Sequence, residues 1–259
     1  NEDNREKVTK NHSATHLLHE SLRMVLGKHV KQKGSLVSSN KLRFDFTNND
    51  SVNTTKIQEI EKIINKVIRQ NLRVTTKIMS HKKAIESGAI GLFGEKYPEN
   101  VRVVSMKSEH KNIIFSSSEL CGGTHVTYTG EIGSMRILSE TSVSSGVRRI
   151  EAVTGEDADK FSNNKSLLLD EIKMLLKANE TNLVTKIKNL LNENQKLTKL
   201  INSSDKNLNF EKKYLENIKD IPVYIQRLKV NPKELKNYAD KIKKELNTCV
   251  IILISNSGD

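Results

Sequence analysis

The stretch Asn11-His12-Ser13-Ala14-Thr15-His16-Leu17-Leu18 places two histidines four residues apart at the beginning of an apolar helical repeat. Leucine and valine continue at helical spacing as far as Gly27, so the pattern predicts a helix over residues 8–29. Side chains four residues apart project from one face of a helix and lie about 5–6 Å from one another. His12 and His16 can therefore reach the same metal ion.

A second group of metal-binding residue types occurs more than a hundred residues later, in Cys121-Gly122-Gly123-Thr124-His125. Cys121 can supply a thiolate, and the two glycines let the loop bend so that His125 joins it. Zinc favours tetrahedral sites with Cys and His ligands. An isolated HxxxH pair is more often a partly buried helix face. Two half-sites in a chain with seven histidines and two cysteines instead predict one zinc site, with the ligands His12, His16, Cys121 and His125.

The number of predicted ligands bears on the chemistry of the site. Four protein ligands close a tetrahedral zinc, which is typical of a structural site. Catalysis would need a loosely held ligand, an expanded coordination sphere, or water activation elsewhere, and the sequence leaves these three open. We interpret His19 as a helix-surface histidine rather than a fifth ligand or proton carrier. Because no covalent nucleophile has a recognisable local context, metal-assisted or substrate-assisted hydrolysis is the simpler hypothesis.

The segments around the half-sites predict an α+β domain. Residues 42–46 alternate as a strand does, and residues 54–71 carry the apolar stripe of an amphipathic helix. Glycines mark turns between short strand-like runs at residues 101–106, 113–117, 135–138 and 148–153. We therefore expect an antiparallel sheet with helices over residues 1–156.

The second part of the chain predicts a helical linker over residues 157–220, with one long polar helix over residues 157–219. Its apolar residues alternate by four and three as in a coiled-coil seam, formed by Leu183, Ile187, Leu190, Asn194, Leu197 and Ile201. A helical hairpin that packs on its own chain is the alternative. Residues 221–259 then predict a strand (223–228), a helix (233–246) and a strand (250–253). We expect this partial β-α-β unit to continue beyond the end of the sequence.

The composition favours a polyanionic partner and a reducing compartment. A net charge of +12 suits contacts with phosphates, although the lysines are spread along the chain and could be ordinary solvated surface. Two cysteines make a disulfide scaffold unlikely, and we interpret Cys249 as a small core residue. No apolar run reaches the roughly 18 residues of a membrane span. We therefore expect a cytoplasmic protein with no membrane partner.

Six motifs together resemble the editing domain of the alanyl-tRNA synthetase family, over about residues 8–156. They are NHSATHLLH (11–19), HVKQKGSLV (29–37), LRFDF (42–46), GLFGEKY (91–97), ELCGGTH (119–125) and GVRRIEA (146–152). The resemblance implies a zinc-dependent domain that hydrolyses the seryl and glycyl esters of tRNA(Ala). It also places the zinc ligands at the four residues named above.

By position, the resemblance implies catalytic roles for Thr15 and Gln32 and substrate binding by Ser35 and Arg43. Thr15 could recognise a seryl hydroxyl, because a site built to hydrogen-bond that group penalises an analogue without it. Taken alone, Gln32 would be a surface amide. Arg43 could contact tRNA, as could Arg148 and Arg149, or these arginines could simply lie on the wet face of their strands.

The resemblance further implies that residues 157–259 form the linker and the start of a C-terminal domain that binds tRNA and promotes homodimers. The family's aminoacylation domain and the β-barrel before the HxxxH helix are absent, so we do not expect this chain to charge tRNA. The leading hypothesis is an editing fragment. The alternatives are a non-catalytic, zinc-stapled module for tRNA binding and dimerisation, and a coiled-coil scaffold with incidental histidines.

Overall fold

The structure is a computed structural model that describes residues 2–91, 96–108, 114–204, 210–228, 232–246 and 248–255. Its internal contacts divide it into two units, Asn1–Asp170 and Glu171–Asp259. The first unit contains both predicted half-sites, and each unit is described separately below.

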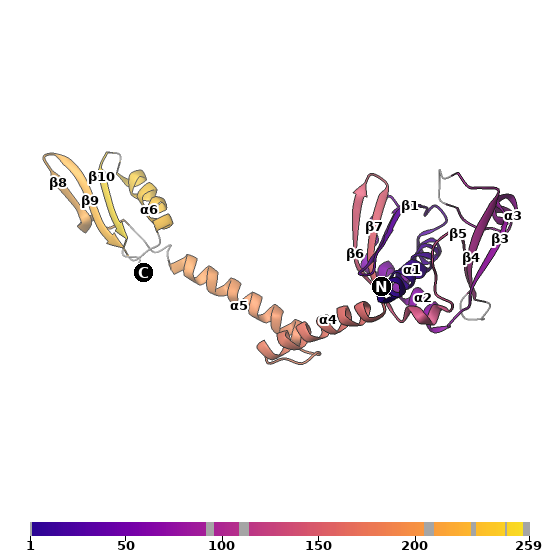
Figure 1. Cartoon of the computed structure of the whole chain (residues 1–259). Helices are drawn as coiled ribbons and strands as arrows, with labels where there is room; N and C mark the ends of the chain where they lie inside the picture. Colours follow the sequence, from indigo (N-terminus) through magenta and orange to yellow (C-terminus); the bar gives the residue numbers. More distant parts are fainter. Residues whose placement is uncertain are drawn as a thin grey trace. The chain divides into compact units, whose positions relative to one another are not determined.

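The first unit is built around helix α1 (Glu2–Leu26), which lies between two antiparallel sheets (Figure 1). One sheet has the order β1-β2-β7-β6, with β1 at Gln32–Val37, β2 at Leu42–Thr47, β6 at Met135–Ser144 and β7 at Val147–Thr154. The predicted alternation of β2 is confirmed: Leu42, Phe44 and Phe46 are fully buried against the core. The odd-numbered residues of β2 therefore point to the other face of the sheet.

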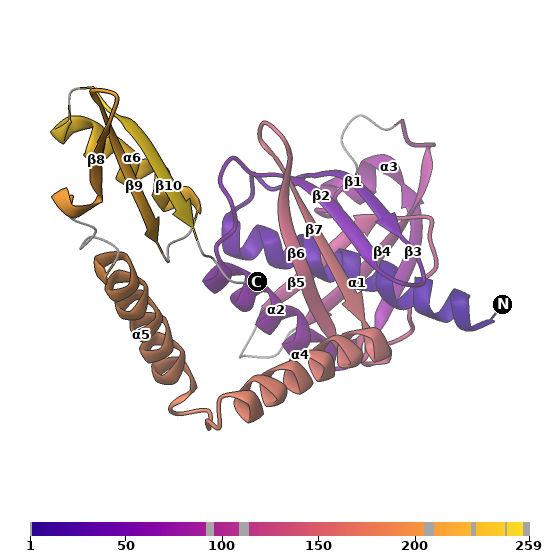
Figure 2. The same cartoon turned by 90° about the vertical axis from the view of Figure 1, so that its left-hand side faces the viewer.

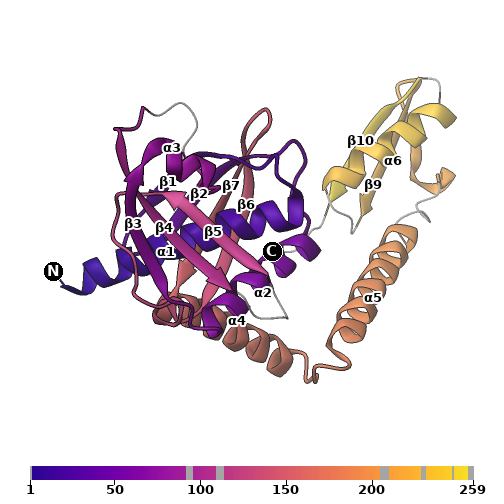
Figure 3. The same ribbon diagram turned by 90° about the vertical axis from the view of Figure 1, so that its right-hand side faces the viewer.

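The second sheet has the order β3-β4-β5, and it covers α1 from the other side (Figure 3). Its strands are β3 (Val74–Ser80), β4 (Asn100–Ser108) and β5 (Phe115–Leu120), and α3 (His81–Glu86) follows β3. The strand predicted over residues 113–117 starts at Phe115, and Ile113 lies outside the described residues, as do residues 92–95 of the GLFGEKY motif. α1 thus has a sheet on both sides, which explains why nearly the whole middle of the helix is buried.

Helix α2 (Thr54–Arg69) packs on α1 and on β6, as its apolar stripe predicts. Its buried Asn65 joins the helix to the start of β6, because the amide Nδ2 donates to the Met135 carbonyl and Oδ1 accepts from the Met135 N–H, both at 2.9 Å. This pair fixes the register between helix and strand through backbone atoms.

Replacing Asn65 by alanine is expected to lower the free energy of unfolding by about 2 kcal/mol, because it leaves two buried backbone groups without partners. Urea unfolding of the purified chain measures this loss. Asn164 is exposed on α4 (Gly155–Leu175) and provides the matched control, for which Asn164→Ala should change stability by less than about 0.5 kcal/mol. Equal stability of the two variants would contradict the role of Asn65.

The second unit contains the predicted β-α-β arrangement (Figure 2). β9 (Ile221–Leu228) and β10 (Val250–Ser255) pair in parallel, and α6 (Pro232–Glu245) connects them in sequence. An additional strand, β8 (Leu215–Ile218), pairs antiparallel with β9 on its other edge. The β-α-β prediction is confirmed, whereas β8 falls within the segment that the sequence predicts as helix.

The single helix predicted over residues 157–219 is wrong. The structure has two helices, α4 and α5 (Leu183–Ser204), separated by residues 176–182. Lys177 has a left-handed φ of 45°, and Asn179 Oδ1 accepts the N–H of Asn182 at 3.0 Å, so the local polar side chains form a turn instead of continuing the helix. Along α5, the seam residues Ile187, Leu190 and Leu197 are exposed. The coiled coil and the domain boundaries stay predictions.

Among the described residues, no helix combines the length and the apolar character that crossing a bilayer requires.

Candidate metal centre and pocket

The four predicted metal ligands come together in the first unit. His12 and His16 project from α1, and Cys121 and His125 lie in the loop that follows β5. Cys121 Sγ is 3.4 Å from His12 Nε2 and 3.3 Å from His125 Nε2. All four ligand atoms lie within 4.8 Å of one another. The arrangement can hold one metal ion.

The Cys121–His125 loop is held in place by hydrogen bonds from both sides. Arg102 on β4 donates through Nη1 to the carbonyls of Cys121, at 2.9 Å, and Gly123, at 2.6 Å. On the helix side, the Ser13 hydroxyl accepts the Val126 N–H at 3.0 Å and lies 3.2 Å from His125 Nδ1. With Nδ1 occupied by Ser13, the Nε2 atom of His125 is the one that faces Cys121.

Gly123 is required because the loop passes directly over the His12 ring. A Cβ atom at this position would lie 2.0 Å from His12 Cε1 and 2.4 Å from His12 Nδ1, which no real contact allows. At the neighbouring Gly122, a Cβ would meet nothing within 4 Å. From the sequence, the glycine pair predicts a bend in the loop. In the structure, Gly123 instead allows the backbone to lie close to the ring of His12.

The charges in the cluster suit a metal cation. Burial alone would raise the pKa of the Cys121 thiol, but hydrogen bonds with His12 and His125 outweigh it and lower this pKa to about 3. Cys121 is therefore a thiolate, the form that binds metals. Burial lowers the pKa of His125, which keeps its imidazole neutral. A thiolate and a neutral imidazole are the protonation states in which Cys121 and His125 would bind a metal.

Two further residues of the site, Glu119 and His19, were not assigned to it from the sequence. The prediction that His19 lies on the helix surface is wrong: it is 2% exposed, because β5 and β2 cover this part of α1, and its Nδ1 lies 3.1 Å from Glu119 Oε1. The other carboxylate oxygen lies 2.7 Å from Nδ1 of the ligand His16. Burial opposes the ionised form of Glu119, but the charge of His16 outweighs it and lowers the pKa of Glu119 to about 2.

The same carboxylate also acts on His16. Burial would lower the pKa of His16, but the negative charge of Glu119 outweighs it and raises this pKa to about 10. The ELCGGTH motif did contain a sequence signal for Glu119. Residues two apart in an extended segment point to the same face, so Glu119 is expected on the same side as the predicted ligand Cys121.

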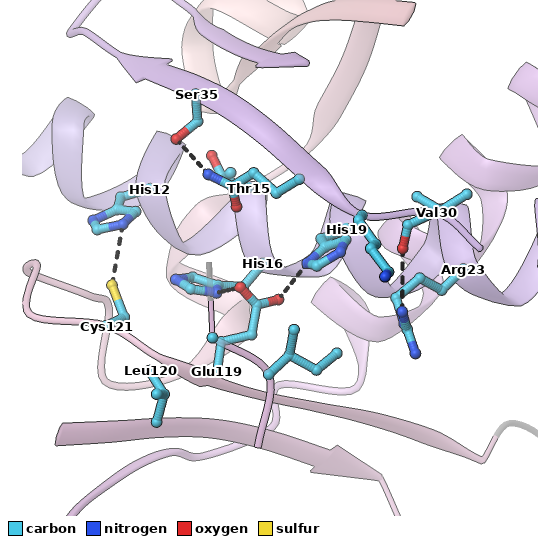
Figure 4. A pocket seen from close by; sticks show the side chains of 14 residues that line it. His12, Thr15, His16, His19, Arg23, Val30, Ser35, Glu119, Leu120 and Cys121 are labelled. Atoms are coloured by element: carbon cyan, nitrogen blue, oxygen red, sulfur yellow. Dashed lines mark hydrogen bonds and ion pairs between the residues drawn. The ribbon is translucent and has the colours of Figure 1, made fainter. Parts of the chain in front are cut away.

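A cavity of about 340 Å³ opens beside the metal cluster (Figure 4). This volume is within the range of about 300–1,000 Å³ typical of ligand pockets. Of the residues predicted to handle substrate, Thr15, Gln32 and Ser35 line it. Gln32 Nε2 donates to Ser35 Oγ at 3.0 Å, and Thr15 Oγ1 donates to the Asn11 carbonyl at 2.9 Å. The polar groups of the predicted amino-acid pocket thus lie beside the ligands.

The end of the cavity away from Cys121 is closed by Arg23, a residue not assigned from the sequence. Its guanidinium donates to the carbonyls of Val30, at 3.1 Å, and Lys28, at 3.3 Å, and so ties the loop after α1 to the helix. Apolar side chains of Val30, Ile90 and Leu120 complete the lining. The pocket therefore combines polar and metal-binding side chains with apolar ones.

The structure does not bring Arg43 to this pocket. Arg43 is one of the odd-numbered residues of β2, so it points away from the core face on which Ser35 and the pocket lie. On that outer face Arg149 forms a two-pronged ion pair with Asp45, at 2.7 and 2.8 Å. Arg148 is opposite Phe46 and so belongs to the other face, where it pairs with Glu140. A contact of Arg43 with tRNA from this outer face stays a prediction.

Comparison with known proteins places this site in a family. The family model described as "Threonyl and Alanyl tRNA synthetase second additional domain" matches residues 101–151, which include nearly all of β4, the whole of β5 and β6, the Cys121–His125 loop and most of β7. An alanine–tRNA ligase of Parvibaculum lavamentivorans (strain DS-1) is 40% identical over 265 residues, which cover 98% of this chain and 30% of that protein.

Alanine–tRNA ligases of two Francisella tularensis strains, SCHU S4 and FSC 198, are each 45% identical over 257 residues, or 96% of this chain and 28% of theirs. The chain therefore spans about 30% of the length of these curated relatives. Over nearly its whole length the chain belongs to the alanine–tRNA ligase family, and it corresponds to a C-terminal portion of these proteins.

Proposed function

We propose that the pocket beside His12, His16, Cys121 and His125 hydrolyses mischarged tRNA(Ala), with zinc as the bound metal. The observation that carries the proposal is the position of Thr15, Gln32 and Ser35 in one cavity with the four metal ligands. The substrates are the seryl and glycyl esters at the 3′ end of tRNA(Ala). The whole protein to which such a portion belongs would attach alanine to tRNA(Ala) with ATP, and this chain alone would not.

The donor set fits zinc. With ordinary zinc bond lengths, sulfur and nitrogen ligands of a tetrahedral ion lie about 3.6 Å apart, close to the 3.4 and 3.3 Å separations of Cys121 Sγ from the two histidine nitrogens. Both ring nitrogens of His16 are buried, and its Nδ1 lies 2.7 Å from Glu119 Oε2, which leaves Nε2 for a metal. When bound there, zinc would supply a Lewis acid that polarises or orients an oxygen of the reacting group.

Thr15 has the hydrogen-bonding state needed to recognise serine. Its hydroxyl proton is used on the Asn11 carbonyl, so its oxygen is left as an acceptor inside the cavity. A seryl hydroxyl can donate to this oxygen. Gln32 is anchored through Nε2 on Ser35, which fixes its amide at the same wall of the cavity. These residues would orient the aminoacyl group beside the metal.

A Thr15→Val variant tests this assignment, since valine keeps the shape of threonine and removes the acceptor. We expect hydrolysis of Ser-tRNA(Ala) to slow about 10- to 100-fold, the effect of a lost hydrogen bond in a buried site, while hydrolysis of Gly-tRNA(Ala) stays within about twofold. The release of radiolabelled amino acid from each ester measures both rates, and Ala-tRNA(Ala) should be stable with either protein. An equal loss with both esters would refute recognition of the seryl hydroxyl by Thr15.

The closed set of four protein ligands favours one alternative function, a non-catalytic module for tRNA binding and dimerisation in which zinc only stabilises the fold. This alternative predicts tRNA binding that weakens steeply with salt, no release of amino acid from any ester, and unfolding of the first unit on chelation. Deacylation with the metal-loaded chain separates the two functions.

The proposed partners are tRNA(Ala) and a second copy of the chain, in the cytoplasm. The net charge of +12 supports binding to tRNA phosphates. The exposed apolar residues of α5 support a homodimer through the helical linker (157–220) and the C-terminal segment (221–259). The remaining segment, 1–156, would be the editing domain.

A further inference from the structure

We propose that Glu119 is a positioning residue that orients His16 toward the metal, and that His19 is the second anchor of its carboxylate. The inference rests on the proposed metal site. Glu119 belongs to the end of β5, and both histidines belong to α1, so a single carboxylate connects the strand that leads to Cys121 with the helix that supplies the other half-site (Figure 4).

Each oxygen of Glu119 is assigned to a different histidine. Oε2 lies 2.7 Å from Nδ1 of His16, and Oε1 lies 3.1 Å from Nδ1 of His19. The first is a close contact between charged groups, and the second is an aligned hydrogen bond. The carboxylate is 9% exposed, and the two imidazoles are 7% and 3% exposed. Water therefore does not compete strongly for any of the three groups.

The contact with Glu119 determines which nitrogen of His16 can bind a metal. A carboxylate against Nδ1 favours the proton on that atom and leaves Nε2 as the donor to the metal. Both ring nitrogens of His16 are buried, and Nδ1 is the one in close contact with Glu119, so Nε2 is the nitrogen left for a metal. An acidic partner on the outer nitrogen of a metal-binding histidine also raises the basicity of the ligand and fixes the plane of the ring.

His19 holds the carboxylate in this position. A buried carboxylate with only one partner is costly and free to rotate about its last bond, so the second donor both stabilises and orients Glu119. The His19 ring is itself packed against Phe44, at 5.3 Å between ring centroids. His19 is therefore not a metal ligand in this proposal. Its role is to donate a hydrogen bond from Nδ1 to Glu119, and this role requires neither metal binding nor proton transfer.

The test compares the zinc affinity of the folded chain with that of three variants, by competition with a chromophoric chelator. Glu119→Gln and His19→Leu should each lower zinc affinity about 10- to 100-fold, the usual effect of losing a partner of a metal-binding histidine. His19→Asn should restore affinity to near the wild-type value, because the asparagine amide can replace the Nδ1–H donor. Cobalt(II) in place of zinc should show altered visible bands in the first two variants only.

Glu140→Gln is the matched control, since Glu140 is a carboxylate of nearly equal exposure, 10%, whose partner is Arg148 rather than a metal ligand. It should keep the wild-type zinc affinity and cobalt spectrum even if it unfolds at a lower temperature. A Glu119→Gln chain with wild-type affinity and spectrum would overturn the inference while leaving the metal site and the hydrolysis intact. A wild-type chain that binds neither zinc nor cobalt would overturn the metal site itself, and this inference with it.

Discussion

Replacing Cys121 by serine is expected to lower zinc affinity about 100- to 1,000-fold, so that the purified chain loses nearly all of its metal. Structural zinc sites bind with about 10–16 kcal/mol, and one thiolate of a four-ligand set contributes a few kcal/mol of that total. Serine at this position stays protonated and neutral, whereas the pKa of the Cys121 thiol is held at about 3 by its histidine neighbours. Elemental analysis of the dialysed protein measures the loss.

Cys249→Ser provides the matched control, because Cys249 is the only other cysteine of the sequence. It is half-buried just before β10, in the second unit, and belongs to no metal-binding group among the described residues. This variant should keep one equivalent of zinc. If both serine variants retain zinc equally, Cys121 is not a ligand and the four-residue site is wrong.

The substitution of Gly123 by alanine should also have a large effect, although no ligand is changed. The added Cβ would lie 2.0 Å from the His12 ring, so either the ring must turn out of the site or the loop that carries Cys121 must move. Both movements disrupt the ligand set, and we expect zinc affinity to fall by about tenfold or more. The same chelator competition measures this change.

Gly122→Ala tests whether the effect depends on position. A Cβ at Gly122 meets nothing within 4 Å, and the residue adjoins Gly123 in the same loop, so the two variants share their chemistry and their local flexibility. Wild-type affinity for the Gly122 variant with weak binding by the Gly123 variant is the expected pair of results. Equal affinities would show that the loop is looser around His12 than the structure describes.

The grouping of His12, His16, Cys121 and His125 could be predicted from the sequence because each half-site lies within a few residues of the chain. Helical periodicity placed His12 and His16 on one face of α1, and alternation placed Phe44 and Phe46 in the core. Strands β1 and β3 were missed because their apolar residues do not alternate regularly with polar ones. Most of their residues are polar and exposed or half-exposed, so the sequence shows no strand-like hydrophobic pattern there.

The supporting residues could not be predicted because their roles depend on contacts distant in sequence. His19 looks like a surface residue until β5, a hundred residues later, brings Glu119 against it. Arg102 is an ordinary strand residue in sequence, and only the fold places it under the Cys121 loop. The break between α4 and α5, by contrast, depends on local contacts. Asn179 and Asn182 form a turn there, and the sequence prediction missed it because the apolar spacing on both sides is helical.

The hydrolysis of mischarged tRNA by this site is tested by the rate of seryl release from Ser-tRNA(Ala) as chelator-treated chain is reloaded with zinc, with bound metal determined on the same samples. The first-order rate should rise in proportion to occupancy of the site and reach its maximum at one equivalent, and the Cys121→Ser chain should stay at the uncatalysed rate. A fully loaded, folded chain that releases serine no faster than buffer would contradict the proposed hydrolysis.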